Sequence, residues 1–383
     1  MNFVCEKDAQ KQQYLLGLDS IKGTNACVFK DLKDLGCAKA ECVRHNAQCS
    51  VLSCNVWSCG FSCTSFSRAN VRSAENRATV GGREGVNVSA DTFSWNLKYV
   101  AKHRPSIIVN ENVEAIDDEA TGTGTPVQEH SKSNLALVLE AYASIGYVAF
   151  SVLMSSDQFG VPQSRRRFYV IGFPNEDLSV HFPGDPRAVV SEMEARINLM
   201  KLEPLGLESF LLEDSDPVVA EELERLQAAK KTQAKRVKST EWQQKHIEVF
   251  SSRGLRWGRV QPSLETEASP WFQALPAREK DIVILAELDG FTTTDLSQSI
   301  GRNRGTRGKI VNTLMPGERR WLVKRRRLLV GCEALSLQAV PWQGKSHIRG
   351  FTSGLLQSLA GNAFTGTTCM AAFAAAISLA KWS

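Results

Sequence analysis

The stretch Val51-Leu52-Ser53-Cys54-Asn55-Val56-Trp57 is mostly apolar, and Gly60-Phe61-Ser62-Cys63-Thr64-Ser65-Phe66-Ser67 follows it closely. The first part predicts a strand, and the second predicts a turn of small residues that presents a cysteine. A strand that ends in such a loop holds a thiol at the open edge of a sheet, where α/β enzymes carry nucleophiles. A lone cysteine is more often structural, so a catalytic role for Cys63 depends on partners elsewhere in the chain.

Strands and helices alternate on both sides of this stretch. Strands are predicted at residues 2–5, 25–30, 51–57, 106–113, 147–153 and 168–173, and helices at 8–16, 93–102 and 134–144. This order predicts a mainly parallel, doubly wound α/β sheet. The pattern becomes irregular after Pro174 and regular again near Arg327. We expect a main α/β domain over residues 1–173, an irregular region over 174–321, and a C-terminal segment, 322–383, that returns to the first domain.

Composition and charge narrow the class of protein. The 383 residues are 43% hydrophobic and 23% charged, which is typical of a soluble globular protein. No secretory leader is evident, and the apolar run 371–380 is too short to cross a bilayer. We therefore expect an intracellular protein without a membrane association and with its ten cysteines reduced. The cluster Cys49, Cys54, Cys59 and Cys63 lacks Cys-x₂-Cys pairs, so no zinc or other metal is expected there.

The net charge is +5, and the basic residues are concentrated near the C-terminus. That basic patch comprises Arg302, Arg304, Arg307, Lys309, Arg319, Arg320, Lys324, Arg325, Arg326 and Arg327, with Glu318 as its only acid. Such a density favours a nucleic-acid partner over a merely solvated face. A second basic run, at residues 230–238, is either a weak nuclear-localisation signal or a solvated helix face. The polar, glycine-containing segment 68–89 predicts a mobile loop that could cover Cys63.

Several short motifs, in a fixed order over nearly the whole chain, together resemble the cytosine-C5 DNA methyltransferase family. Gly60-Phe61-Ser62-Cys63 with Phe66-Ser67 is similar to its nucleophile loop, and Glu111-Asn112-Val113 after Arg104-Pro105 is similar to its Glu-Asn-Val segment. The later motifs are Gly160-Val161-Pro162-Gln163-x-Arg165-x-Arg167, then Arg327, Glu333, Leu337-Gln338 and Pro341, and finally Gly361-Asn362-Ala363. The resemblance implies a class I, Rossmann-like S-adenosylmethionine-dependent methyltransferase fold, with residues 174–321 as an inserted target-recognition region.

The resemblance also implies a reaction and the residues that perform it. Cys63 would add to C6 of a flipped cytosine, Glu111 would donate a proton or hydrogen bond at N3, and Arg167, with Arg165, would bind O2. The activated C5 would then take a methyl group from S-adenosylmethionine. Ser67, Asn112 and Gln163 would support substrate binding. Glu6 would hold the cofactor ribose, Asp31 its adenine, and Asn362 would lie near its methionine end.

The sequence also departs from the family pattern. The chain opens at the family's second strand, without the Phe-x-Gly-x-Gly loop, so we expect an N-terminally truncated fold. A truncated gene model, a fragment completed by another chain and an inactive relic are all compatible with this. Ser62 replaces a proline and is expected to loosen the loop, and Lys7 replaces an aromatic residue beside the adenine site. DNA cytosine-C5 methylation, in the nucleus, is the expected function; a tRNA methyltransferase and an inactive nucleic-acid-binding pseudoenzyme are the alternatives.

Overall fold

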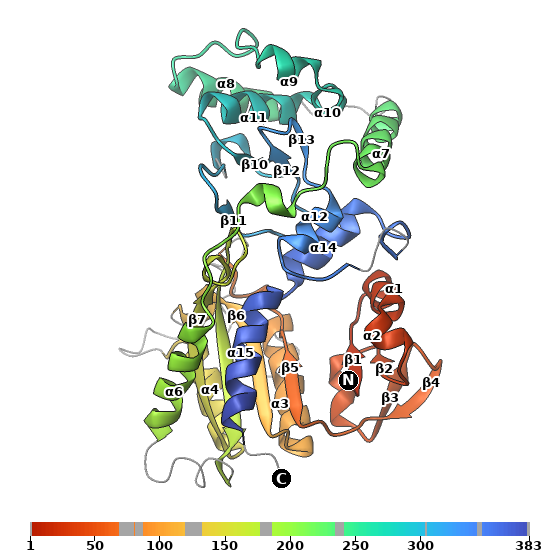
Figure 1. Ribbon diagram of the computed structural model, residues 1–383, viewed down its shortest axis with the longest axis vertical. Coiled ribbons are helices and arrows are strands. Elements are labelled where there is room, and N and C mark those ends of the chain that lie inside the picture. Colours follow the sequence, from red (N-terminus) through yellow and green to blue (C-terminus); the bar gives the residue numbers. More distant parts are fainter. Residues whose placement is uncertain are drawn as a thin grey trace. The chain divides into compact units, whose positions relative to one another are not determined.

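The computed structural model describes residues 2–68, 80, 87–118, 132–176, 186–233, 241–302, 305–342 and 347–380. The chain forms two units, which are described separately (Figure 1). The first unit comprises residues 1–159, 166–202 and 366–383, and the second comprises 160–165 and 203–365. Most of the predicted covering loop at 68–89 and the basic run at 230–238 lie outside the residues whose side chains are described.

The central sheet of the first unit has the order β5 (Val56–Cys59), β6 (Ile107–Val113), β9 (Arg166–Pro174) and β7 (Tyr147–Ser155). β5 and β6 pair in parallel, whereas β9 is antiparallel to both β6 and β7. The α/β prediction is confirmed, but the sheet is mixed and not mainly parallel. Gly172 of β9 allows this pairing, because a Cβ atom there would lie 2.8 Å from the side chain of Ile108.

Two layers of helices cover the faces of this sheet (Figure 1). On one face, Ile107 and Val109 pack with α6 (Pro186–Leu199) and α15 (Gly366–Leu379). On the other, Ile108 packs with α3 (Val88–His103) and α4 (Asn134–Ser144). The alternation along β6 follows from the two-residue period of a strand, and it leaves β6 buried on both sides.

A second sheet in the first unit has the order β1 (Phe3–Cys5), β2 (Cys27–Phe29), β3 (Lys39–Cys42) and β4 (Ala47–Ser50). β1 and β2 are parallel, and β2, β3 and β4 are successively antiparallel. Between these strands lie α1 (Ala9–Gly17), α2 (Asp19–Lys22) and the short 3₁₀ helix η1 (Leu32–Gly36). The hairpin β3–β4 was not predicted, because its residues are small or polar and the alternation of β3, with Ala40 and Cys42 buried, is only four residues long.

Side chains connect the two sheets of the first unit. The Phe3 ring lies 5.9 Å from that of Trp57 on β5 and 5.8 Å from that of Tyr99 on α3. The Asn2 amide donates to the carbonyl of Ser53 at 2.9 Å. Among the described residues, no backbone hydrogen bond joins β1 to β5. The sheets therefore share one hydrophobic core without sharing a ladder.

The second unit contains most of the region after residue 203. Its strands β10 (Thr293–Asp295), β12 (Arg320–Leu322) and β13 (Arg327–Leu328) form an antiparallel sheet, and β8 (Gln163–Ser164) pairs with β11 (Val311–Asn312). Its helices are α7 (Pro217–Gln233), α8 (Glu241–Ser252), α9 (Leu264–Ala268), α10 (Pro270–Ala274), α11 (Ala277–Leu288), α12 (Gly331–Ser336) and α14 (Ser353–Asn362). Short 3₁₀ helices complete the two units: η2 (Glu114–Asp117) and η3 (Ser156–Gln158) in the first, and η4 (Leu207–Phe210) and η5 (Ile300–Arg302) in the second.

The unit boundaries differ from the predicted ones at two places. Residues of α6 stay with the first unit, because Val189, Met193 and Ile197 are buried against α15. Residues 322–365 belong to the second unit instead of returning to the first. There Arg327 is 1% exposed and pairs with Glu333 and Asp214.

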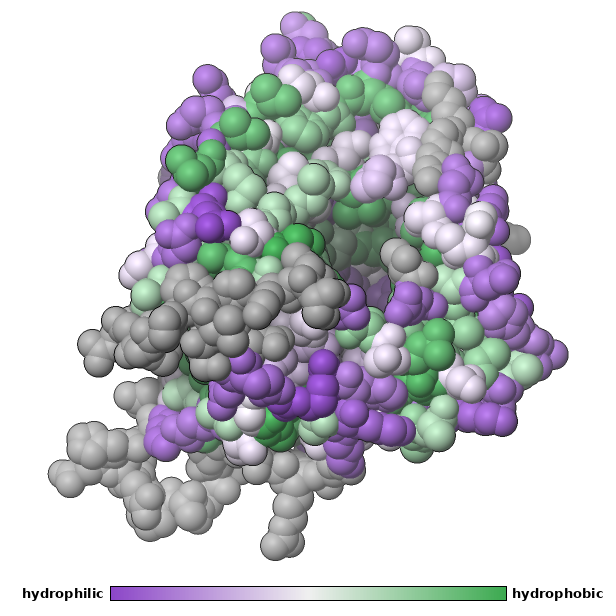
Figure 2. Space-filling model, turned by 60° about the horizontal axis from the view of Figure 1, so that its bottom comes forward, coloured by the Kyte–Doolittle hydropathy of each residue, from purple (hydrophilic) through white to green (hydrophobic). Residues whose placement is uncertain are grey.

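The surface mixes hydrophilic and hydrophobic residues, as the face in Figure 2 shows. Large exposed apolar side chains such as Leu199, Leu264 and Met370 are scattered along the sequence. One stretch, Ser353–Leu379, is long and apolar enough by composition to cross a membrane, and 44% of the tested window is buried. It comprises two helices, α14 and α15, which belong to different units.

Candidate active site

Cys63 lies in the loop that follows β5, between two buried aromatic anchors. Phe61 and Phe66 are buried, and the Phe61 ring packs 5.1 Å from that of Phe93 on α3. The backbone N–H groups of Phe66 and Ser67 both donate to the carbonyl of Cys63, at 3.0 and 2.9 Å. The turn is therefore closed on its own backbone, and Cys63 is half-buried within it. A substrate role for Ser67 remains a prediction.

The N-terminal end of α3 holds the other side of this loop. The N–H of Ser62 donates to Thr92 Oγ1 at 3.0 Å, and the N–H of Ser65 donates to Ser89 Oγ at 3.2 Å. Ser65 Oγ in turn donates to Asn87 Oδ1 at 3.1 Å. A proline at position 62 has no N–H and could not make the first bond. Ser62 thus contributes an anchor of its own, where the sequence predicted only a loosened loop.

Glu111 and Arg167 face each other from neighbouring strands. Arg167 Nε lies 3.0 Å from Glu111 Oε1, and the two side chains are 14% and 11% exposed. The contact is close enough for an ion pair but is not aligned as a hydrogen bond. β6 ends at Val113, as predicted, and β9 pairs with its polar end through Glu111 and Asn112. Glu111 is therefore held within a strand.

Asn112 ties the Cys63 loop to β6. Its Nδ2 donates to the carbonyl of Phe61 at 3.1 Å, and its Oδ1 accepts from the N–H of Val113 at 2.8 Å. The parallel register pairs Cys59 at the end of β5 with Asn110 on β6. The loop after Cys59 therefore starts beside the segment that carries Glu111. A thiol, a carboxyl group and a guanidinium group are thus gathered at one edge of the sheet.

Cys369 on α15 was not anticipated as a neighbour of this group. Burial, together with the charge of Glu111, raises the pKa of its thiol to about 12. The thiol therefore stays protonated at neutral pH, unlike a nucleophile. An isolated cysteine in an Ala-rich helix gives no sequence signal for such a position.

Glu6 and Asp31 follow the adjacent parallel strands β1 and β2, so the structure brings these two predicted site residues together. Glu6 Oε1 accepts from the N–H of Asp8 at 2.8 Å, and Asp31 Oδ1 accepts from that of Lys33 at 3.1 Å. Burial raises the pKa of the neighbouring Cys5 thiol, and Cys59, Asp31 and Glu6 raise it further. The charges of Glu6, Asp31 and Cys59 thus all act on the Cys5 thiol. The ends of β1, β2 and β5 therefore lie at one edge.

Arg165 and Gln163 both make hydrogen bonds within the second unit. The Arg165 guanidinium donates to the carbonyls of Leu314, Gly361 and Ala363 at 3.0–3.3 Å within the second unit. Gln163 is 0% exposed; its Nε2 donates to the Leu337 carbonyl and its Oε1 accepts from the N–H of Leu314, both at 3.0 Å. Both side chains therefore connect loops of this unit. A substrate role for either residue remains a prediction.

Asn362 lies at the end of α14 in the second unit. Its Nδ2 donates to the carbonyl of Ser358 at 2.7 Å, and its side chain is exposed. The preceding Gly361 is required by packing, since a Cβ atom there would lie 2.3 Å from the backbone nitrogen of Pro316. A cofactor contact by Asn362 remains a prediction.

The predicted basic patch is largely neutralised by acids from distant parts of the second unit. Arg319 pairs with Glu279 at 3.1 Å, Arg320 with Glu318, Arg325 with Glu208 at 2.7 Å, and Arg327 with Glu333 at 2.8 Å. Arg320 and Arg327 are buried. Arg302, Arg307, Lys309 and Lys324 are exposed, and Arg304 lies outside the described residues. The patch is therefore smaller than its sequence density suggests.

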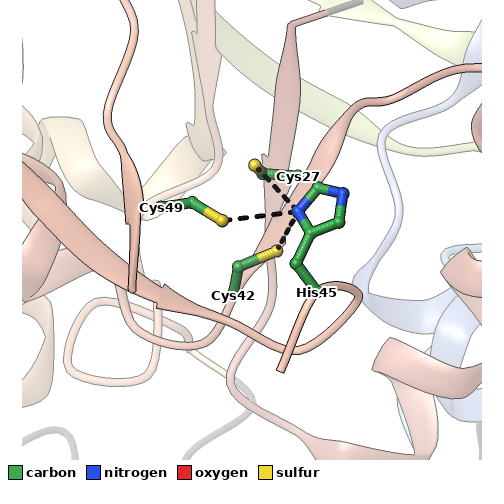
Figure 3. A group of neighbouring side chains, drawn as sticks. All are labelled: Cys27, Cys42, His45 and Cys49. Carbon is green, nitrogen blue, oxygen red and sulfur yellow. Dashed lines mark hydrogen bonds between the residues drawn. The ribbon is translucent and has the colours of Figure 1, made fainter. Parts of the chain in front are cut away.

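The four clustered cysteines of the sequence are separated in the structure. Cys54 Sγ lies 3.4 Å from Tyr99 OH, and burial raises the pKa of Cys59 to about 12. Cys49 instead joins Cys27, Cys42 and His45, whose possible ligand atoms all lie within 4.8 Å of one another (Figure 3). The prediction that no metal is bound was based on the first group of cysteines and did not take this second group into account.

Comparison with known proteins gives the following matches. The model of the C-5 cytosine-specific DNA methylase family matches residues 44–369. The DNA (cytosine-5-)-methyltransferase DMT5 of Cryptococcus neoformans var. grubii is 25% identical over 408 residues, which cover 99% of this chain but 15% of that protein. Type II methyltransferase M.Bsp6I of a Bacillus species is 30% identical over 143 residues, 37% of this chain and 39% of that one. The structure of the S. pombe Dnmt2 methyltransferase covers 98% of this chain and 89% of its own, at 12% identity and a TM-score of 0.44.

Proposed function

Because the chain belongs to the C-5 cytosine-specific DNA methylase family, we propose that it transfers a methyl group from S-adenosylmethionine to C5 of cytosine in DNA. The observation that carries the proposal is the Glu111–Arg167 pair, 3.0 Å apart, beside the loop that holds Cys63. S-adenosylmethionine is the methyl donor of this family, and the family has a class I fold. The chain spans 15% of the length of the fungal relative. The activity is therefore proposed from the residues of this chain and not from the activity of that longer protein.

The proposal gives each residue of the group one step. The Cys63 thiolate forms a bond to C6 of cytosine, and electron density moves onto the ring. Glu111 takes up a proton when the base binds and, in this protonated form, donates to N3, where that density develops; Arg167, released from the ion pair, binds O2 and favours the thiolate form of Cys63. The activated C5 takes the methyl group. C5 then loses its proton, and the bond between sulfur and C6 breaks to restore the aromatic ring.

Glu6 and Asp31 fit the adenosine part of the methyl donor. Each uses one carboxylate oxygen to cap the backbone that follows it. Lys7, whose side chain is largely exposed, lies 3.5 Å from the other oxygen of Asp31 in a loose ion pair that a ligand could displace. Glu6 would bind the ribose hydroxyls and Asp31 the adenine amino group. The donor itself supplies the electrophilic methyl group.

DNA is the substrate that the relatives' names support, since DMT5 is named as a DNA (cytosine-5-)-methyltransferase. A flipped base suits a thiol held in a loop at a sheet edge. The exposed Arg302, Lys309 and Lys324 of the second unit would contact phosphates, and residues 203–321 would serve target recognition. A nuclear location agrees with a DNA substrate, and imaging of a fluorescent fusion would test it.

Covalent trapping tests the nucleophile directly. DNA that contains 5-fluorocytosine cannot lose the C5 substituent as a proton, so it should form a denaturant-stable adduct in the presence of S-adenosylmethionine. The adduct should be absent from Cys63→Ser and unchanged in Cys37→Ser, whose thiol is exposed and outside the group. An adduct that persists in Cys63→Ser contradicts the assignment. A 5-fluorocytosine-containing tRNA that traps the wild-type chain while DNA does not would identify RNA as the substrate instead.

Calorimetric titration with S-adenosylmethionine separates the enzyme from a pseudoenzyme. The 383-residue chain should bind the donor, and Asp31→Asn should weaken binding about tenfold or more, because a charged hydrogen-bond partner is lost. The matched control is Asp34→Asn, which lies on η1 close to Asp31. DNA binding without donor binding would mean that this polypeptide is a nucleic-acid-binding pseudoenzyme.

A further inference from the structure

Three cysteines and a histidine of the smaller sheet in the first unit converge on one point (Figure 3). Cys27 lies at the start of β2, Cys42 at the end of β3, and Cys49 on β4. His45 lies in the turn between β3 and β4, where Asn46 takes a left-handed conformation with φ 48°. The four residues therefore come from three strands and one turn. None of them is among the residues assigned to the candidate active site.

The sheet register explains why the three thiols lie on one face. Cys49 pairs with Ala40, two residues before Cys42, so Cys42 and Cys49 are diagonal neighbours on the same side of the hairpin. Phe29 pairs with Cys42, which places Cys27, two residues earlier on β2, on that side as well. The tight turn at Asn46 brings the His45 imidazole back over this face.

The distances match tetrahedral coordination of a metal ion. The Sγ atoms of Cys27, Cys42 and Cys49 lie 3.6, 3.4 and 3.4 Å from Nδ1 of His45. Zinc bonds of about 2.3 Å to sulfur and about 2.0–2.1 Å to nitrogen, at a tetrahedral angle, place the two ligand atoms about 3.6 Å apart. All four possible ligand atoms lie within 4.8 Å of one another. One ion could therefore contact all four atoms.

Hydrogen bonding does not account for this arrangement. A neutral imidazole nitrogen either donates one hydrogen or accepts at one lone pair, so Nδ1 can satisfy only one of the three thiols. A disulfide would join two of the three cysteines and leave the third, whereas all three are free in the structure. Convergence of three sulfur atoms on one nitrogen is the arrangement expected around a shared cation.

We propose that Cys27, Cys42, His45 and Cys49 bind a structural zinc ion. Three thiolates and an imidazole are a ligand set typical of zinc, and four protein ligands leave no open position for catalysis. Iron–sulfur clusters generally require four cysteine thiolates, so the histidine disfavours them. The sequence signal is Cys42-x₂-His45-x₃-Cys49, with Cys27 upstream. A search for Cys-x₂-Cys pairs overlooks it, because a histidine occupies the second place.

The ion would stabilise a hairpin that has little else to hold it. On the outer strands, Lys39, Glu41, Ala47, Gln48 and Ser50 are exposed, and a hairpin with so small an apolar face is marginal in water. Arg44 already fixes the turn to the preceding chain, since its guanidinium donates to the carbonyls of Ala26 and Lys22 at 3.4 and 3.3 Å. A zinc ion would add a direct link from β2 to both strands of the hairpin.

Metal analysis of the purified 383-residue chain tests the proposal, independently of the proposed function. The wild-type chain should contain about one zinc per molecule by plasma mass spectrometry. In His45→Ala and in Cys42→Ser the zinc content should fall about tenfold or more. Cys37→Ser, a nearby exposed cysteine outside the group, is the matched control and should keep it. If either variant fails to fold, His45→Cys is the decisive variant. It keeps four metal ligands and should retain zinc.

Cobalt substitution gives a second readout that does not depend on stability. Chain reconstituted with Co²⁺ should show the visible absorption of a tetrahedral, sulfur-rich site, and the bands should shift in His45→Cys. A wild-type chain without zinc after purification in zinc-supplemented medium, or zinc retained equally by His45→Ala and Cys42→Ser, would overturn the proposal. A disulfide between any two of the three cysteines under reducing conditions would also overturn it.

Discussion

At the residue scale, Glu111 and Arg167 carry opposite charges into an environment with little water. Their side chains are 11% and 14% exposed, so each charge depends on the other for compensation. The neighbouring pair of Arg166 and Glu114 has a similar separation, 3.2 Å, but its side chains are 53% and 34% exposed. Water already screens that second pair. The two pairs therefore provide a controlled comparison between a buried and an exposed interaction on the same strand.

Replacement of Arg167 should destabilise the protein more than replacement of Arg166. Arg167→Ala leaves the Glu111 carboxylate buried without its guanidinium partner, at a cost of about 2–3 kcal/mol. Arg166→Ala should cost about 1 kcal/mol or less. Chemical denaturation of both variants at neutral pH measures the free energy of unfolding. Equal losses would show that the buried pair contributes no more than the exposed one.

The two arginines of the Gln163-x-Arg165-x-Arg167 motif show how far residue roles follow from sequence. The motif marks a functional region, and the structure places Arg167 beside Glu111. It places Arg165 against the carbonyls of Leu314, Gly361 and Ala363, which lie far along the chain. The sequence contains the same residue type at both positions. Only the tertiary fold determines which guanidinium meets a carboxylate and which meets backbone.

At the element scale, α3 is both a core helix and the support of the Cys63 loop. Asn87 caps its N-terminus by accepting from the N–H of Ala90 at 2.9 Å, and the same oxygen accepts from Ser65. Ser89 and Thr92 in the first turns accept from the loop backbone. The order of the loop is therefore coupled to the order of the helix end.

Removal of the Asn87 cap should loosen the Cys63 loop specifically. Asn87→Ala should cost about 1 kcal/mol of stability and raise the rate at which iodoacetamide alkylates Cys63, measured by mass spectrometry of the Cys63 peptide. Ser133→Ala removes the N-cap of α4, where Ser133 Oγ accepts from Ala136 at 3.1 Å, and is the matched control. It should lower stability by a similar amount and leave the alkylation rate unchanged. Equal acceleration in both variants would contradict the coupling.

Elements with a strong apolar period were predictable, and polar ones were not. The helix predicted at 134–144 coincides with α4, which has an apolar sequence and a serine N-cap. The β3–β4 hairpin escaped prediction because its strands are short and consist of small or polar residues. The polar end of β6, at residues 110–113, was predicted, but its antiparallel pairing with β9 was not. Such partners come from distant sequence.

At the scale of the whole molecule, opposite charges that are far apart in sequence neutralise each other. The arginines near residue 320 meet acids at positions such as 208, 214, 279 and 333 within the second unit. Local charge density therefore overestimated the surface available to a polyanion. The α/β class was predictable from alternation, whereas the mixed sheet and the unit boundaries depend on long-range packing between α6 and α15.

The absence of a backbone ladder between β1 and β5, among the residues described, has a consequence for cooperativity. The strands β1–β4 are joined to the central sheet by side chains such as Phe3, Trp57 and Tyr99, so they can open without breaking the β6–β9 ladder. Amide hydrogen–deuterium exchange should show residues 3–50 losing protection as one sub-global unit, before β6 and β9. A zinc chelator should widen the difference. Uniform protection across both sheets would mean that side-chain contacts alone can make the two sheets unfold as one.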